Sequence, residues 1–165
     1  MSTTTPCLWF DTQGEEAANF YTGVFPNSRI LDVTRYGEAG PGPEGSVMTV
    51  TFELDGRRFV ALNGGPHFTF TEAVSFQVDC ETQEEVDYFW SKLSEGGEEI
   101  QCGWLKDRYG LSWQIVPTVL HELIGDPDPE KSRRVVTAML GMIKLDIAEL
   151  RRASESAQEA AAVHE

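Results

Sequence analysis

The sequence predicts an α+β fold made of two tandem β-α-β-β-β units and a helical tail. Three observations predict it. A strand-then-helix pattern near the start recurs 68 residues later, each copy is followed by short strands with alternating apolar residues, and the apolar spacing becomes purely helical after Pro117. With 165 residues and 41% hydrophobic content, the chain suits one domain with a single sizeable core.

The first copy opens with a predicted strand at residues 8–11 and a predicted helix at 14–25, in which apolar residues recur at helical spacing. Thr12 and Glu15 have the spacing of a capping box at the start of this helix. Three strands should follow, at 29–36, 47–54 and 57–63. The last two of these are joined by a tight turn at Asp55 and Gly56.

The second copy has a predicted strand at 76–79 and a predicted helix at 82–93, capped by Thr82 with Glu85. Four of its positions agree in residue type with the first copy when aligned without a gap: Asp11 with Asp79, Glu16 with Glu84, Phe20 with Tyr88, and Tyr21 with Phe89. Strands are expected at 99–102, 104–106 and 111–116, with Tyr109 and Gly110 at the last turn.

The glycine- and proline-rich stretch at 37–45 joins two strands, so it is no phosphate-binding turn, which would lead from a strand into a helix. It is either a lid or a plain connector. The tail should form helices at 119–124, from Asp128 and Pro129 to about Leu140 with Gly141 as the stop, and from Asp146 to about Arg152.

The predicted domain therefore spans residues 1–118, with repeats at 4–66 and 72–118. The helices of 119–154 are expected to pack on this domain or on a dimer partner, and residues 155–165 are expected to fray.

The composition argues against several partners and compartments. There are 27 acidic against 13 basic side chains, and the formal charge of −14 repels phosphate backbones and anionic lipids, so we expect neither nucleic acid nor membrane as a partner. There is no long apolar run and no secretion-signal pattern, so a cytoplasmic location is expected. Cys7, Cys80 and Cys102 form no C-x-x-C pair, which suggests neither a disulfide framework nor a zinc site.

Several segments resemble the PhnB-like family of the glyoxalase/bleomycin-resistance, or vicinal oxygen chelate, superfamily. They are residues 6–11, 15–21, 25–28, 62–66 and 107–114, and the similarity extends from about Thr4 to about Arg151. The resemblance implies a cupped eight-stranded mixed sheet around a cleft in a glyoxalase-like domain. Members of this family often carry the label 3-demethylubiquinone-9 3-methyltransferase.

Metal-dependent relatives in this superfamily take one ligand from each of four strands. Side-chain alternation places Thr5, Ala73 and Gln114 at three of these positions, and Val60, Leu62 or Asn63 at the fourth. None of these side chains is anionic or an imidazole, which divalent ions require at several corners. We therefore expect no metal and no cofactor.

The strand faces predict a ligand pocket lined by Cys7, Trp9, Asn63, Ser75, Gln77, Trp104 and Gln114, with His67 at its rim because it lies on the connection between the two repeats. His67 is either a general base or a solvent-facing loop residue, and Cys7 is either a nucleophile or a packing residue. Trp9 and Trp104 either line the pocket or pack in the core, whereas Trp90 and Trp113 should be structural. No catalytic residue is assigned.

Three functions remain open. The first is a metal-free, homodimeric protein that binds a small molecule, which the uncharged cleft favours. The second is a superfamily enzyme, a lyase, dioxygenase or transferase, acting on a small organic substrate. The third is the methyltransferase of the family label, although the first strand runs into Thr12 and Gln13 rather than the glycine-rich turn of a typical methyltransferase fold.

Overall fold

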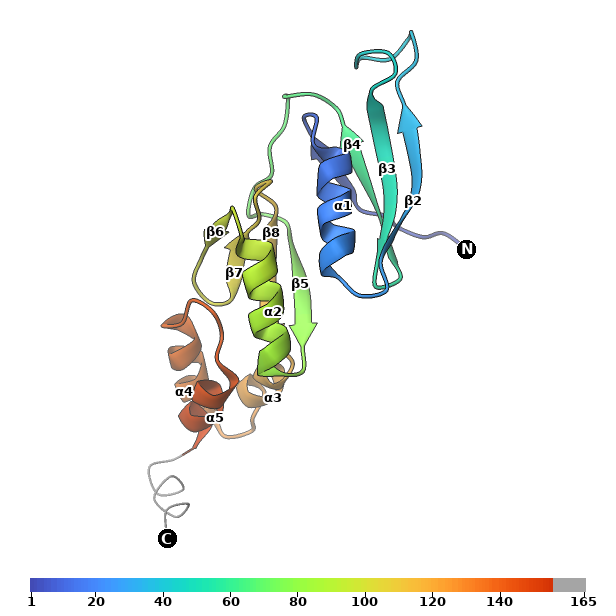
Figure 1. Ribbon diagram of the computed structural model, residues 1–165. Coiled ribbons are helices and arrows are strands. Elements are labelled where there is room, and N and C mark those ends of the chain that lie inside the picture. The colour runs from blue at the N-terminus through green and yellow to red at the C-terminus, as the bar shows by residue number, and fades with distance from the viewer. Residues whose placement is uncertain (156–165) are drawn as a thin grey trace. The chain divides into compact units, whose positions relative to one another are not determined.

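The computed structural model describes residues 1–155 and confirms an α+β fold built from tandem β-α-β-β-β units (Figure 1). The chain divides into a first unit, Met1–Phe70, and a second unit that begins at Thr71. The first unit contains β1 (Cys7–Phe10), α1 (Gly14–Val24), β2 (Arg29–Arg35), β3 (Val47–Leu54) and β4 (Arg57–Asn63). The second unit contains β5 (Ser75–Cys80), α2 (Gln83–Ser94), β6 (Glu98–Glu99), β7 (Trp104–Lys106), β8 (Ser112–Pro117), α3 (Val119–Ile124), α4 (Pro129–Leu140) and α5 (Ile147–Ser154).

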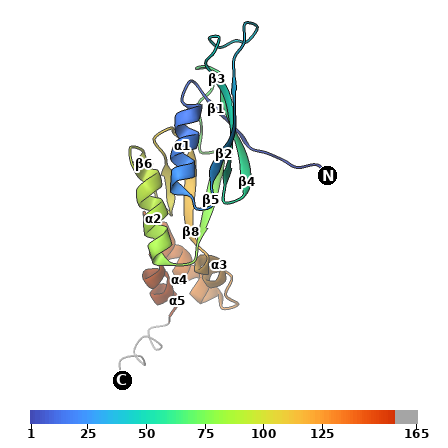
Figure 2. The same ribbon diagram turned by 45° about the vertical axis from the view of Figure 1, so that its right-hand side comes forward.

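In the first unit the strands form one sheet in the order β1-β4-β3-β2, with β1 parallel to β4 and the other pairs antiparallel. Helix α1 lies along one face of this sheet (Figure 2), where the ring of Tyr21 stacks on Phe52. Leu8 and Phe10 are buried, as alternation along β1 predicts. The tight turn at Asp55 and Gly56 is confirmed, since both residues have positive φ, as a type I′ hairpin turn requires.

The predicted capping box at the start of α1 is wrong. The N-cap residue is Gln13, and no side chain caps the helix locally. Instead the amide Oδ1 of Asn63, at the end of β4, accepts a hydrogen bond of 2.7 Å from the backbone N–H of Gly14. A long-range partner has therefore taken the place that Thr12 and Glu15 were expected to fill.

The second unit repeats the arrangement, with strand order β5-β8-β7-β6 and a parallel pair of β5 with β8. The predicted cap of α2 is confirmed, because the Thr82 hydroxyl accepts a hydrogen bond from the N–H of Glu85. Trp90 and Trp113 are buried, as predicted, and each indole N–H donates to a carboxylate, Glu99 and Asp107 respectively.

Asp107 is a buried carboxylate in the turn between β7 and β8, only 2% exposed. Its Oδ1 accepts hydrogen bonds from the backbone N–H groups of Tyr109 (2.8 Å) and Leu111 (3.1 Å). Its Oδ2 accepts a hydrogen bond of 2.9 Å from the indole N–H of Trp113. The carboxylate therefore shapes the turn and fixes the orientation of a core tryptophan.

The tail helices pack on the second unit around a core that they share with β8, consisting of Val116, Leu120, Val135, Met142, Leu145 and Leu150. The predicted caps are confirmed, with Asp128 and Asp146 accepting at the starts of α4 and α5 and Gly141 at the end of α4. The side-chain amide of Gln83, at the start of α2, donates to the carbonyl of Leu145 and accepts from the N–H of Ile147.

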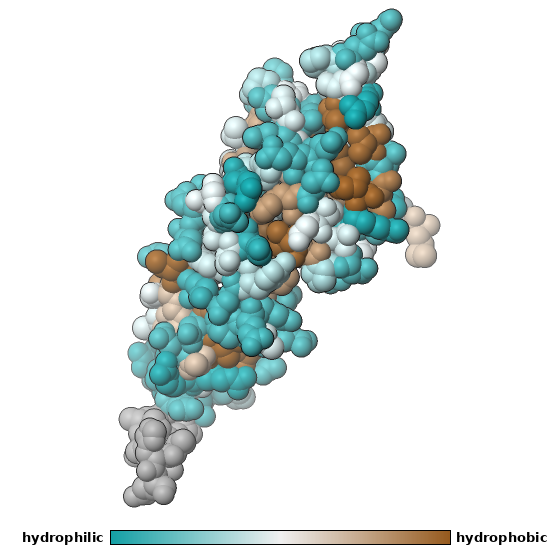
Figure 3. Space-filling view, in the orientation of Figure 1, coloured by the Kyte–Doolittle hydropathy of each residue, from teal (hydrophilic) through white to brown (hydrophobic). Residues whose placement is uncertain are grey.

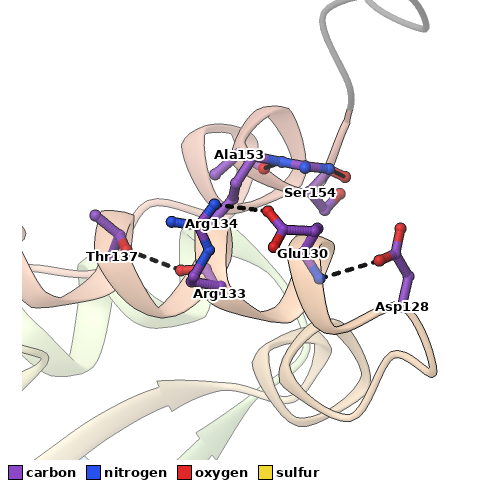
Figure 4. Close-up of polar contacts among 7 residues, drawn as sticks. All are labelled: Asp128, Glu130, Arg133, Arg134, Thr137, Ala153 and Ser154. Carbon is purple, nitrogen blue, oxygen red and sulfur yellow. Dashed lines mark hydrogen bonds and ion pairs between the residues drawn. The ribbon is translucent and has the colours of Figure 1, made fainter.

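Polar contacts join α4 to the end of α5 (Figure 4). The guanidinium of Arg134 donates to the carbonyl oxygens of Ala153 and Ser154, at 3.0 and 2.9 Å, which caps α5. Arg133 pairs with Glu130 one turn earlier. Fraying was expected for residues 155–165, of which 156–165 lie outside the described residues.

The surface of the first unit shows apolar side chains over β2 and β3 (Figure 3), where Val33 of the edge strand β2 is exposed. Among residues 1–155, no helix is long and apolar enough to cross a bilayer.

Candidate functional site

A cleft of about 600 Å³ opens at one end of the first unit, within the size range of small-molecule sites. Three segments line it: the connection from β1 to α1, the loop between β2 and β3, and the chain that follows β4. The lining residues are Asp11, Thr12, Glu15, Arg35, Tyr36, Pro41, Gly42, Pro43, Ser46, Val47, Asn63, Gly64, Gly65, Pro66 and His67. We call this the first-unit cleft.

Hydrogen bonds of Asn63 connect the three segments that line the first-unit cleft. Its Oδ1 accepts from Gly14, its Nδ2 donates to the carbonyl of Val47 at 3.2 Å, and its backbone carbonyl accepts from the hydroxyl of Tyr36 at 2.5 Å. Both ends of the amide are thus occupied, so Asn63 sets the shape of the cleft.

The loop between β2 and β3 forms one wall of the first-unit cleft. The sequence allowed two interpretations of this loop, a lid or a plain connector. It is held to Tyr36, whose backbone N–H donates to the carbonyl of Ser46 and whose carbonyl accepts from Gly45. Gly40 and Gly42 lie so close to the Tyr36 ring that a Cβ on either would overlap it. The absence of side chains at these two positions lets the loop pack closely against the Tyr36 ring.

Two of the predicted pocket residues, Asn63 and His67, lie in the first-unit cleft. Trp9 lies on the other face of the sheet. Its neighbour Phe10 pairs with Asn63, which faces α1, and adjacent residues of a strand point to opposite faces. The Trp9 indole N–H donates to the carbonyl of Gly65, a lining residue of the cleft, at 2.9 Å.

Cys7 shares the face of Trp9 and is exposed. Although the residue is exposed, desolvation by the atoms packed around it raises the pKa of the thiol, so the thiol stays protonated near neutral pH and is a poor nucleophile.

The other four predicted pocket residues are neighbours on one face of the second sheet. Gln114 pairs with Gln77 on β5 and with Trp104 on β7. Its side-chain amide donates to the hydroxyl of Ser75 at 2.8 Å. The amide of Gln77 donates to Asp79 and lies 3.5 Å from the ring nitrogen of His121. Hydrogen-bonding groups are therefore concentrated on this face.

The strand pairing settles the register that the sequence left open. Trp9 pairs with Leu62 in the first unit as Gln77 pairs with Gln114 in the second, so Leu62 is the counterpart of Gln114. With this register, the positions that the sequence predicted for the four ligands are Thr5, Leu62, Ala73 and Gln114. Leucine and alanine offer no donor atom, so this set does not fit a divalent ion. Within residues 1–155, no three His, Cys, Asp or Glu side chains gather into a metal-binding group.

The residues of the first-unit cleft that the sequence reasoning missed include four with ionisable or hydroxyl side chains: Asp11, Glu15, Arg35 and Tyr36. Their positions along the chain were the signal that could have found them. Each lies at or just beyond the end of a strand, or in the first turn of the following helix, and such ends meet where loops build binding sites.

Three solved structures resemble this chain. A PhnB protein of Bacillus cereus is 40% identical, with a TM-score of 0.65, and the alignment covers 71% of this chain and all of that one. A protein of Pseudomonas aeruginosa is 17% identical with a TM-score of 0.60, covering 71% of this chain and 98% of that one. The fosfomycin resistance protein FosX of Listeria monocytogenes, solved with Mn(II) and sulfate, is 14% identical with a TM-score of 0.51, covering 73% and 93%.

The fold is thus that of the glyoxalase/bleomycin-resistance proteins in the vicinal oxygen chelate superfamily. Residues 2–116 match the sequence profile of the 3-demethylubiquinone-9 3-methyltransferase family. The chain belongs to this PhnB-like family. A search of curated proteins found no match. Helices α3 to α5 lie beyond the residues that the profile covers.

Proposed function

We propose that this protein binds a small organic molecule in the first-unit cleft. The observation that carries the proposal is the cleft itself, whose volume suits such a ligand and whose walls combine ionisable groups with the apolar Pro41, Pro43 and Val47. Its shape is set in advance by the contacts of Asn63 and Tyr36, and a pre-formed site loses less entropy when a ligand binds.

The polar face of the second sheet, with Ser75, Gln77, Trp104 and Gln114, is proposed as a further ligand-contacting surface, together with Cys7 and Trp9 on the first sheet. Amide groups can donate and accept, and an indole ring offers a flat surface for an aromatic ligand. The sequence predicted these six residues as part of one ligand pocket, and their contact with a ligand is a proposal.

An NMR screen with a library of small organic fragments tests the cleft. Hits should shift the backbone amide signals of Glu15, Gly64 and His67. Thr12→Trp places a large side chain in the cleft from an exposed position and should abolish these shifts. Thr4→Trp adds the same side chain at an exposed position outside the cleft and serves as the matched control. Binding that both variants preserve equally would place the ligand elsewhere.

A second candidate is a superfamily enzyme, including the methyltransferase activity in the family's name. The residues after β1 do not fit S-adenosylmethionine as typical methyltransferases hold it, since Asp11 to Gln13 lead into α1 without a glycine-rich turn. Calorimetric titration with S-adenosylmethionine distinguishes the two functions, because tight binding would favour the enzyme.

We further propose a cytoplasmic homodimer. Open sheet edges such as β2 invite pairing with a second copy, and apolar Val33 is exposed there. Light scattering at micromolar concentration should give twice the chain mass of 18.4 kDa, and a monomer mass would contradict the dimer.

A further inference from the structure

Ionisable groups of both signs line the first-unit cleft. The carboxylates of Asp11 and Glu15 come from the connection between β1 and α1. The guanidinium of Arg35 comes from the end of β2, and the imidazole of His67 follows β4. Acidic and basic groups therefore reach the cleft from different segments of the chain.

These groups are not paired with one another. Within residues 1–155, the side chains of Asp11, Glu15 and His67 have no hydrogen bond or ion pair. Arg35 has one, from its guanidinium to the carbonyl of Gly45 at 3.0 Å. A guanidinium has five N–H donors, so most of those of Arg35 remain available to a ligand. Among the described residues, the acidic and basic groups share one cleft without forming an ion pair with each other.

From this arrangement we infer that the first-unit cleft recognises a small zwitterion, a free amino acid or short peptide. Its ammonium group lies toward Asp11 and Glu15, and its carboxylate toward Arg35. The inference rests on the proposed binding function of the same cleft. A molecule with both charges satisfies both walls at once, and two attachment points fix its orientation.

The electrostatics disfavour a ligand with a single charge. The net charge of −14 and the two carboxylates repel a simple anion. A simple cation would be attracted to Asp11 and Glu15 but would leave Arg35 without a partner in the cleft. Contacts inside a cleft are less screened by water than those on an open surface, which strengthens both ends of the proposed interaction.

Three matched probes test the charge requirement by NMR titration of the full chain: the dipeptide L-alanyl-L-leucine, its N-acetyl derivative and its C-terminal amide. The dipeptide carries both charges, the acetyl derivative only the negative one and the amide only the positive one. The dipeptide should bind most tightly, and each blocked form should bind about two- to fivefold more weakly, as expected for a partly exposed ion pair.

Charge-removing variants connect each preference to its residues. In the double variant Asp11→Asn and Glu15→Gln, the dipeptide and its acetyl derivative should bind equally. In Arg35→Gln, the dipeptide and its amide should bind equally. Glu38→Gln and Arg57→Gln change the net charge by the same amount per residue at exposed positions outside the cleft, and both should keep the wild-type ratios.

The outcomes separate this inference from the proposed function. Equal binding of the three probes, a preference for the amide alone, or control variants that change the ratios as much as the cleft variants would overturn the zwitterion. So would a cleft that binds uncharged fragments but no dipeptide, and small-molecule binding would then still stand. If neither fragments nor dipeptides shift the cleft signals, both proposals fail.

Discussion

Replacing Asp107 with asparagine should weaken the fold strongly although the change is nearly isosteric. Asparagine keeps one oxygen for the N–H groups of Tyr109 and Leu111, but it presents an NH₂ group to the indole N–H of Trp113. One hydrogen bond to a charged group is lost, about 1.5–3 kcal/mol, and a buried indole donor is left without its acceptor. We expect a loss of about 2–4 kcal/mol in the free energy of unfolding.

Urea denaturation followed by tryptophan fluorescence measures this loss. Asp32→Asn is the control, because this exposed side chain on β2 has no hydrogen bond within residues 1–155, and a change within about 0.5 kcal/mol is expected there. Trp113→Phe keeps an aromatic side chain, although a smaller one, and removes the N–H, so Asp107→Asn should cost less in that background. If Asp107→Asn lowers stability by under about 0.5 kcal/mol, the structural role of this carboxylate is refuted.

Three more outcomes follow from burial and packing. With Ellman's reagent at pH 8, the exposed Cys7 should react slowly, because its pKa is raised, and Cys80 should not react until the protein unfolds. Burial, with the nearby charges of Glu85 and Asp79, raises the pKa of Cys80 to about 12, which leaves about one thiolate in ten thousand at pH 8. Gly42→Ala should lower the free energy of unfolding by about 1–3 kcal/mol in a urea titration, because its Cβ would overlap Tyr36. Gly23→Ala, in open space on α1, should instead raise it by about 0.5–1 kcal/mol.

The segment 107–114, which carries part of the family resemblance, owes its pattern to folding. Asp107 shapes the turn, Gly110 takes the positive φ of 86° that the turn requires, and Trp113 fills the core. A motif of this kind identifies the family through its architecture, and it supplies no evidence for a methyl transfer.

Local signals predicted most of the fold. The cap at Thr82, the Asp128 and Pro129 start of α4, and the turn at Asp55 and Gly56 each depend on neighbours within a few residues, so the sequence was sufficient to place them. The start of α1 was mispredicted because its capping partner, Asn63, lies 49 residues away. A local pattern cannot reveal an acceptor brought in by the tertiary fold.

The candidate site was predicted less well than the fold, for a related reason. Alternation correctly assigned the faces of β1, as the burial of Leu8 and Phe10 demonstrates. It was wrong in putting Asn63 on the face of Trp9, because Asn63 pairs with Phe10 and faces α1. The first-unit cleft, however, is built from chain beyond the strand ends, where no period of two applies. Asn63 and His67 were found through their place near the end of β4, whereas Arg35 and Tyr36 precede a loop whose path depends on packing around an aromatic ring.

The matching strand registers of the two sheets show how a duplicated framework can diverge. At the same structural position one copy holds Trp9 beside Leu62, and the other holds Gln77 beside Gln114. Since each sheet keeps its own hydrogen-bond ladder, substitutions on one face leave the other copy's architecture intact. Each half can therefore carry its own surface chemistry, amides in one and hydrocarbon in the other, on the same backbone framework.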